Sequence, residues 1–306
     1  MMTRLLTRLA WAIVVLWGTT VLTFLIAHAV PADPARVYAG ANADAETVAR
    51  IRHEMRLDDP LPMQYVRYLG ALLQGDMGTS LVTNERVADA IWVRLPATVA
   101  LSLTAVVLWM LISIPLGVWT AHRRGTAIDR SVLIIGLVAI SLPIFWLARM
   151  LQYYLAYQGG IFPVAGFTGW RHILLPAIAL AVVTAGYYAR LIHTSMVEAL
   201  NQEYVRVARA KGLSEARVLF KHALRNALIP VVTILGLDVA TLLGGVVFTE
   251  SVFALPGLGA LALQSVFTLD VPMIMGVVLF SAVLVVGANI AVDFVCGWID
   301  PRVQSD

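Results

Sequence analysis

The chain has 306 residues, of which 59% are hydrophobic and only 13% are charged. So few polar side chains cannot cover a water-soluble fold of this size, and the composition predicts a membrane protein. A net charge of +3 gives no reason to expect a nucleic-acid partner, and the single cysteine, Cys296, excludes a disulfide framework and a zinc cluster.

Six apolar runs approach or exceed the ~20 residues that cross a bilayer core, and we predict a transmembrane helix for each. In chain order they cover residues 6–30, 97–121, 131–156, 174–195, 229–249 and 272–298. The first run ends in Ala27-His28-Ala29, which resembles a signal-peptidase site. Its apolar stretch is longer than the usual ~7–15 residues of a signal core, so we predict a helix that is retained.

Basic residues near the short loops predict the orientation of these helices. The stretches 1–8, 122–130 and 206–225 are rich in arginine and lysine and fall on one side. The short loops on the other side, 157–173 and 250–271, carry only Arg171. We therefore place the amino terminus, the 196–228 loop and the carboxyl terminus in the cytoplasm. The 31–96 segment, with seven arginines and nine acidic residues, is predicted to be external.

The external segment has a helical pattern of its own. Residues 45–56 and 63–74 have the character of two short helices, and Leu61, Tyr65, Leu69 and Leu72 recur at helical spacing. This pattern predicts a small cap over the outer mouth of the helices. Such a cap either shields the helix ends or also contacts a partner.

The cytoplasmic loop over 203–230 is also patterned. A helix is predicted to run to Lys211, to break at Gly212, and to be followed by a second short helix that Ser214 caps and in which Glu215 occupies the first turn. One face of the second helix is formed by Val218, Leu219 and His222. The opposite face carries Arg217, Lys221 and Arg225. Such a loop docks against a partner, or lies solvated or on lipid as an amphipathic segment.

Motifs for catalysis and nucleotide binding are missing from the sequence, which lacks Gly-x-x-x-x-Gly-Lys-Ser/Thr, His-Glu-x-x-His and Gly-x-Ser-x-Gly. The histidines are scattered, so we predict no metal site. An intramembrane enzyme needs paired catalytic groups, and the predicted spans hold only isolated ones. Any dependence on ATP would therefore require another chain.

Two stretches of the cytoplasmic loop, 208–214 (ARAKGLS) and 221–230 (KHALRNALIP), resemble the EAA loop of ABC importer permeases, more narrowly that of the dipeptide/oligopeptide/nickel branch. Arg206 and Val207 stand where the broad family has Glu and Ala, and the closing proline is delayed to Pro230. The branch is similar in these departures. Further segments, 57–65, 75–81, 141–146, 250–259 and 299–302, are similar to the B-type, first permease subunit of dipeptide importers.

The resemblance implies an all-α, polytopic membrane protein with six transmembrane helices and the type I ABC importer transmembrane fold. A single permease domain would span 1–306 in the bacterial plasma membrane. The implied partners are a second homologous permease subunit, ATP-binding cassette ATPase subunits, an extracytoplasmic substrate-binding protein and the lipid bilayer. ATP and Mg would bind in the ATPase subunits, and this chain would bind no cofactor. The cargo would be a di- or oligopeptide, with nickel chelate, glutathione or another small cargo as alternatives. An ion-coupled secondary carrier is the alternative mechanism.

In the family, the EAA loop forms a coupling helix that sits in a cleft of the ATPase, and the 250–259 segment lies at the external gate. The residues implied in coupling are Arg206, Ala208, Lys211, Gly212, Leu213, Ser214, Arg217, Leu219, Phe220, Lys221 and Arg225. The residues predicted for the translocation path or gate are Asp238, Glu250, Phe253, Pro256, Gly257 and Arg149. Pro256 and Gly257 predict a tight, partly re-entrant turn or an ordinary helix-breaking loop.

Charged residues inside the predicted spans have two interpretations, because a charge in hydrocarbon marks either a cavity or a structural pair. Asp238, near the middle of the fifth span beside Gly236, faces the translocation path or makes a structural pair or interhelical hydrogen bond. Arg149, in the outer part of the third span, can also extend its side chain outward in a structural role, which is the favoured interpretation. Asp293 is predicted to anchor the last span at the cytoplasmic interface.

Overall fold

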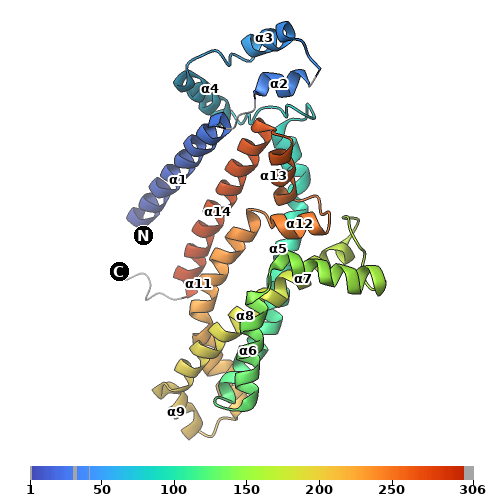
Figure 1. Ribbon diagram of the computed structural model, residues 1–306. Helices are drawn as coiled ribbons and strands as arrows, with labels where there is room; N and C mark the ends of the chain where they lie inside the picture. The colour runs from blue at the N-terminus through green and yellow to red at the C-terminus, as the bar shows by residue number, and fades with distance from the viewer. Residues whose placement is uncertain (1, 30–32, 41, 300–306) are drawn as a thin grey trace. The chain divides into compact units, whose positions relative to one another are not determined.

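The computed structural model describes residues 2–29, 33–40 and 42–299, and the described chain is all-α apart from one antiparallel bridge between Thr79 and Arg86 (Figure 1). The chain divides into two compact units. Unit 1 holds the described residues of Met1–Thr98, Leu243–Val247 and Pro256–Gly287. Unit 2 holds those of Val99–Leu242, Phe248–Leu255 and Ala288–Asp306. The terminal motif 299–302 lies outside the described residues beyond Ile299, as do residues 30–32 and 41 of the first span and external segment.

Unit 1 contains the amino-terminal helices and parts of two long ones. Its helices are α1 (Met2–Ala29), α2 (Pro34–Ala39), α3 (Ala45–Glu54), α4 (Leu61–Leu73), the start of α5 (Val87–His122), α13 (Leu258–Phe267) and most of α14 (Val271–Ile299). The two short helices predicted within residues 31–96 are confirmed as α3 and α4, and α2 adds a third, while the external position of this segment stays a prediction. The Asp44 side chain caps α3 by accepting from the Thr47 backbone N–H. Hydrogen bonding with the Thr47 side chain, and next with this backbone N–H, lowers the pKa of Asp44.

Helix α4 is attached to α1 by aromatic and polar contacts. The ring of Phe24 lies 5.3 Å from that of Tyr65 and 6.0 Å from that of Tyr68, centroid to centroid. The hydroxyls of Thr20 and Tyr65 are 2.9 Å apart. Burial raises the pKa of Tyr68 to about 12, so its phenol stays neutral. These contacts fix the cap to the first apolar helix.

The core of unit 1 lies where α5, α13 and α14 meet. Its buried side chains are those of Val87, Ala90, Ile91, Leu258, Leu261, Met273 and Val277. The helices approach closely because Gly276 has no side chain: a Cβ there would lie 2.3 Å from a Val87 methyl. A polar contact joins the segment before α5 to the start of α14: the Ser80 hydroxyl donates to Asp270 at 2.5 Å, and both residues are buried.

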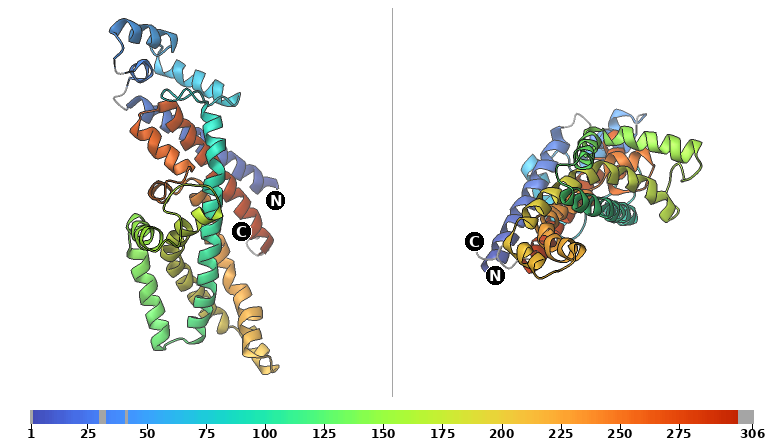
Figure 2. Two further views of the ribbon diagram at one scale, coloured as in Figure 1. Left: turned by 90° about the vertical axis from the view of Figure 1, so that its right-hand side faces the viewer. Right: turned by 90° about the horizontal axis from the view of Figure 1, so that it is seen from below.

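Unit 2 contains the remaining helices. They are the rest of α5, α6 (Ala127–Ser141), α7 (Ile144–Leu151), the π-helix η1 (Gln152–Gln158), α8 (Trp170–Leu200), α9 (Glu203–Ala210), α10 (Glu215–Arg217), the π-helix η2 (Val218–Ala223), α11 (Leu224–Leu243) and α12 (Val247–Val252). Helices α6 and α8 run side by side (Figure 1, Figure 2). They touch at a glycine pair, where a Cβ on Gly186 would lie 2.6 Å from the Gly136 Cα.

Five helices of the described chain are long and apolar enough to cross a membrane, and a bent pair supplies a sixth span if it counts as one. The five are Thr7–His28, Val87–His122, Trp170–Leu200, Glu215–Leu243 and Val271–Val292. The second begins at Val87 rather than at residue 97 and continues through Pro96. The number of spans agrees with the six predicted when the bent pair counts as one, whereas several bounds and one shape differ.

The predicted third span, 131–156, is wrong as a straight helix. It is broken into Ala127–Ser141 and Ile144–Gln158, which are bent by 99°. The cause is Pro143, which has no backbone N–H and forces Leu142 into an extended conformation with ψ of 130°. Helices α7 and η1 therefore lie across the direction of α6.

The predicted fifth span, 229–249, also needs correction. The helix is continuous from Glu215, so the expected second short helix of the loop is the start of this span. It ends at Leu243, and Gly245 with φ of +114° separates it from α12. A Cβ at Gly245 would lie 2.9 Å from the Gly259 backbone nitrogen, so the break depends on glycine.

Candidate functional site

The loop that follows α8 forms a helix–break–helix arrangement, as predicted. Helix α9 ends at Ala210, and Gly212 has a φ of +74°. The Gly212 N–H donates to the Arg209 carbonyl at 2.9 Å, and the Leu213 N–H to the Ala208 carbonyl at 3.4 Å. This is the Schellman pattern of a helix carboxyl end, which favours glycine because L side chains rarely adopt positive φ. Gly212 therefore ends one helix and lets the next start in a new direction.

An ion pair connects the two arms of this bend. The Arg209 guanidinium donates to both carboxylate oxygens of Glu215, at 2.6 and 3.3 Å. The hydrogen bond with Glu215 raises the pKa of Arg209. Both side chains are more than 40% exposed, so the pair contributes at most ~1 kcal/mol. Ser214 has the backbone geometry of an N-cap, but its hydroxyl makes no capping bond. Glu215 is the residue that fastens the bend.

The predicted coupling residues divide by burial. Most are exposed on α9, the bend and the start of the following helix: Arg206, Lys211, Gly212, Ser214, Arg217, Phe220, Lys221 and Arg225, with Leu213 half-buried. Ala208 and Leu219 are only 5% and 8% exposed. Contact of the Leu219 side chain with an ATPase cleft is therefore the wrong expectation, because it packs within this chain. Phe220, 57% exposed, and Val207, 52% exposed, are apolar side chains that a partner can reach.

Asp238 lies near the carboxyl end of α11, because that helix stops earlier than predicted. The Tyr188 hydroxyl on α8 donates to the Asp238 carboxylate at 2.6 Å. Tyr188 is fully buried and stacks on Trp109 of α5, with ring centroids 5.7 Å apart. The small residue Gly236 allows close helix approach, since a Cβ there would lie 2.1 Å from a Val292 methyl. The interhelical hydrogen bond considered from the sequence is thus present, and a role of Asp238 in the path stays a prediction.

The predicted gate segment folds into α12 and a tight turn. Glu250 and Phe253 are 1% and 2% exposed. Ala254 adopts a φ of +49°, and the Leu255 N–H returns to the Glu250 carbonyl at 2.9 Å. The Phe253 carbonyl accepts from the Gly166 N–H at 3.0 Å, which ties the turn to the 159–169 loop. The gating role of this segment stays a prediction.

Beyond this turn, Pro256 is exposed and Gly257 is buried in unit 1. Gly257 precedes α13 in extended conformation, with φ of −103°. The first N–H of α13, on Leu258, is satisfied by the Thr98 hydroxyl at 2.8 Å. Helix α13 therefore begins at a side-chain hydrogen bond from α5.

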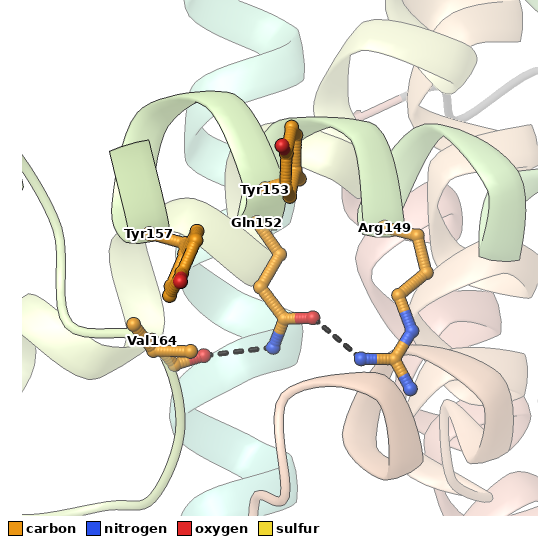
Figure 3. A pocket seen from close by; sticks show the side chains of 5 residues that line it. All are labelled: Arg149, Gln152, Tyr153, Tyr157 and Val164. Atoms are coloured by element: carbon orange, nitrogen blue, oxygen red, sulfur yellow. Dashed lines mark hydrogen bonds between the residues drawn. The ribbon is translucent and has the colours of Figure 1, made fainter. Parts of the chain in front are cut away.

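Arg149 is exposed on α7, after the bend at Pro143. Its guanidinium donates to the side-chain oxygen of Gln152 at 2.7 Å. The two residues line a cavity with Tyr153, Tyr157 and Val164 (Figure 3). Arg149 thus has a specific hydrogen-bond partner, Gln152, that the sequence did not predict. The outward-directed structural role of Arg149 stays a prediction.

Sequence reasoning also missed a buried polar cluster beside the 122–130 turn. Asp129, 5% exposed, accepts from the Gly125 N–H at 2.9 Å and lies 3.5 Å from His193 of α8. His193 is also 3.1 Å from the Thr120 hydroxyl. Asp129 and His193 are far apart in the chain, so no spacing signalled the pair. Within the described residues, no three His, Cys, Asp or Glu side chains come together as metal ligands.

Comparison with known proteins decides the family. A family model described as the binding-protein-dependent transport system inner membrane component matches residues 113–305, and one for the amino-terminal part of such membrane components matches residues 1–102. The chain belongs to this family. It is therefore a transport permease subunit and a multi-pass inner membrane protein.

Similar permeases extend over the whole chain. This permease is 41% identical to a putative peptide transport system permease protein of Brucella melitensis biotype 1, with 100% of both chains covered. It is 38% identical to an oligopeptide transport system permease protein of Bacillus subtilis, over 97% of this chain and 98% of the other. It is 38% identical to a glutathione transport system permease protein of Salmonella paratyphi A, over 99% of each chain.

The fold of the permease is also found in a solved structure. An inward-facing conformation of the MetNI methionine ABC transporter matches with a TM-score of 0.57 at 21% sequence identity, over 69% of this chain and 96% of the other. At this identity the likeness concerns the fold alone. It confirms the predicted all-α transmembrane fold of type I ABC importers.

Proposed function

We propose that this permease forms half of the translocation path of an ATP-driven importer of di- or oligopeptides. The observation that carries the proposal is its full-length likeness to permeases named for peptide, oligopeptide and glutathione transport. A second, homologous permease subunit would complete the path. An extracytoplasmic binding protein would deliver the cargo. Glutathione, nickel chelate or another small cargo is the alternative within the same architecture.

The coupling segment, residues 203–225, is proposed to transmit the movement of separate ATPase subunits. ATP and Mg would bind in those subunits. Their closure would push on the exposed face that carries Phe220, Arg217 and Lys221. Because the helix from Glu215 continues without interruption to Leu243, a push on this face would tilt the fifth span directly. Tilting would alternate access to the path, with Asp238 beside it and the 250–257 segment at its external gate.

Reconstitution of the complete importer tests this function. Proteoliposomes that contain both permeases, the ATPases and the binding protein are expected to take up a labelled dipeptide only when ATP and Mg are present on the side of the membrane where the ATPases lie. Excess unlabelled dipeptide should compete more strongly than glutathione or a nickel chelate. Uptake driven by an ion gradient without ATP would instead identify a secondary carrier, and preferential competition by glutathione would change the cargo.

Orientation is tested with single cysteines. In a Cys296→Ala background, Gln74→Cys and Ser214→Cys replace exposed residues just after α4 and in the coupling segment. Because positive loops stay in the cytoplasm, an impermeant thiol reagent added to intact spheroplasts is expected to label position 74 and not position 214. Permeabilised cells should label at both positions. Labelling of both positions in intact spheroplasts would contradict the proposed topology.

A further inference from the structure

A cavity of about 320 Å³ opens beside the bent helix pair, lined by Arg149, Gln152, Tyr153, Tyr157 and Val164. Figure 3 shows the Gln152 amide between the Val164 carbonyl and the Arg149 guanidinium. The volume of the cavity lies at the lower end of the ~300–1,000 Å³ typical of small-ligand cavities. All of its lining residues come from α7, η1 and the loop that follows.

Gln152 holds the cavity in shape. The side chain is only 6% exposed, and its amide nitrogen donates to the Val164 carbonyl at 2.8 Å and the Val252 carbonyl at 3.0 Å. Its amide oxygen accepts from Arg149 at 2.7 Å. Every hydrogen-bonding group of a buried side chain is thus used to join three segments and to fix the guanidinium. Such full satisfaction indicates a rigid site.

The Arg149 guanidinium has more N–H donors than its bond to Gln152 uses. It presents five N–H groups, and in the described part of the chain Gln152 is its one hydrogen-bond partner. The remaining edge of the planar group is suited to two parallel hydrogen bonds with an oxyanion such as phosphate or carboxylate. The charge and geometry of the cavity therefore fit an anionic group.

The tyrosines supply an amphipathic wall. The rings of Tyr153 and Tyr157 stack with centroids 5.8 Å apart at 24°, and the two side chains are 46% and 71% exposed. Both lie on η1, and π-helical turns are frequent at functional sites. A ligand with an anionic head and an apolar or glycerol-like body would place its head on Arg149 and its body along these rings.

The 99° bend sets α7 and η1 nearly perpendicular to α6. Because α6 runs beside α8, which is long enough to cross a membrane, α7 and η1 then lie along the membrane surface. Phe145, Trp146 and Tyr154 on the same bent segment are also 47–58% exposed. Aromatic side chains of this kind gather at the level of lipid headgroups, and arginine at this depth meets their phosphates.

We propose that the Arg149 cavity is a binding site for an anionic phospholipid headgroup, whose phosphate accepts hydrogen bonds from Arg149 and whose glycerol part lies on Tyr153 and Tyr157. Because Gln152 also holds the Val252 carbonyl at the end of α12, the occupied cavity stiffens the α12 segment. The proposal does not depend on the identity of the transported cargo.

The test measures headgroup binding to the complete, delipidated importer by native mass spectrometry with short-chain phosphatidylglycerol. Arg149→Gln is expected to weaken this binding by about tenfold or more, because charge-assisted hydrogen bonds are lost. Arg171→Gln, which removes an exposed arginine outside the cavity, is the matched control and should leave the affinity near that of the wild type. Tyr157→Ala should weaken binding more than Tyr154→Ala, because Tyr154 does not line the cavity.

Three outcomes would overturn the proposal. Equal losses of phosphatidylglycerol affinity in Arg149→Gln and Arg171→Gln would mean that the lipid is attracted to positive charge in general and not to this cavity. Inorganic phosphate bound as tightly as phosphatidylglycerol would mean a free-anion site, and displacement of phosphatidylglycerol by a dipeptide would mean a cargo carboxylate. Should Arg149→Gln fail to assemble, the comparison of Tyr157→Ala with Tyr154→Ala decides, and equal affinities of these two would reject the site.

Discussion

Gly212→Asp is expected to reduce ATP-driven uptake by about tenfold or more, while the permease still accumulates in the membrane; tenfold corresponds to a loss of ~1.4 kcal/mol. A Cβ at Gly212 meets nothing within 4 Å, and aspartate is among the residues that tolerate positive φ, so the fold should accept the substitution. What changes is the exposed bend, where a carboxylate appears between Arg206 and Arg217. The measurements are uptake, co-purification of the ATPases and membrane abundance.

Matched variants separate the charge from other effects. Gly212→Asn has the same size and backbone tolerance without the charge, and should reduce uptake less. Gly75→Asp makes the same substitution at the glycine that follows α4, which has a φ of +80°, open space around it and the same pair of helix-ending hydrogen bonds, and should leave ATPase retention unchanged. Arg217→Ala should be milder, since an exposed rim charge contributes modestly. Normal uptake and normal ATPase retention in Gly212→Asp would refute the coupling role of the segment.

Asp238→Asn is expected to lower uptake by about tenfold or more without loss of assembly, because an ionisable residue at membrane depth marks a functional site. The Asn side-chain oxygen can still accept from the Tyr188 hydroxyl, so the substitution removes the charge and keeps the hydrogen bond. Uptake and the amount of assembled importer in the membrane are measured together.

Tyr188→Phe is the reciprocal variant, since it keeps the charge and removes the hydrogen bond. It should destabilise the helix packing by ~1–3 kcal/mol, with a smaller effect on the uptake of whatever importer assembles. If Asp238→Asn transports normally and Tyr188→Phe fails to accumulate, Asp238 serves the packing of α8 and α11 and has no part in the path. Equal loss of assembly in both variants leads to the same conclusion.

Local pattern was enough to predict most of the long apolar helices of this permease. The predicted span 174–195 lies within α8, and the predicted span 272–298 lies within α14. The break at Gly212 was equally readable, because a glycine after a basic helical turn and before Ser214 is a local signal of a helix end. Hydropathy, capping and helix termination depend on neighbouring residues, and these are all present in one stretch of sequence.

The direction of a helix was harder to predict from the sequence, even where the residue that changes the direction was in plain view. Pro143 stands in the middle of the run predicted as a single span, yet the apolar residues continue on both sides of it. Hydropathy records only that these residues avoid water. The 99° bend was therefore missed, and with it the cavity that Arg149 and Gln152 line.

The partners of the buried polar groups were decided by tertiary structure alone. Tyr188 and Asp238 are 50 positions apart, and Gln152 and the Val252 carbonyl are 100 apart. Nothing in the spacing of either pair favours its contact, as the missed pair of Asp129 and His193 also illustrates. A buried polar group must find a donor or acceptor, and the one it finds is set by how the helices rotate and pack. That packing depends on all the apolar contacts of the unit together, so the sequence by itself determined which stretches form apolar helices, whereas the tertiary structure decided which of their side chains are buried and which of them meet.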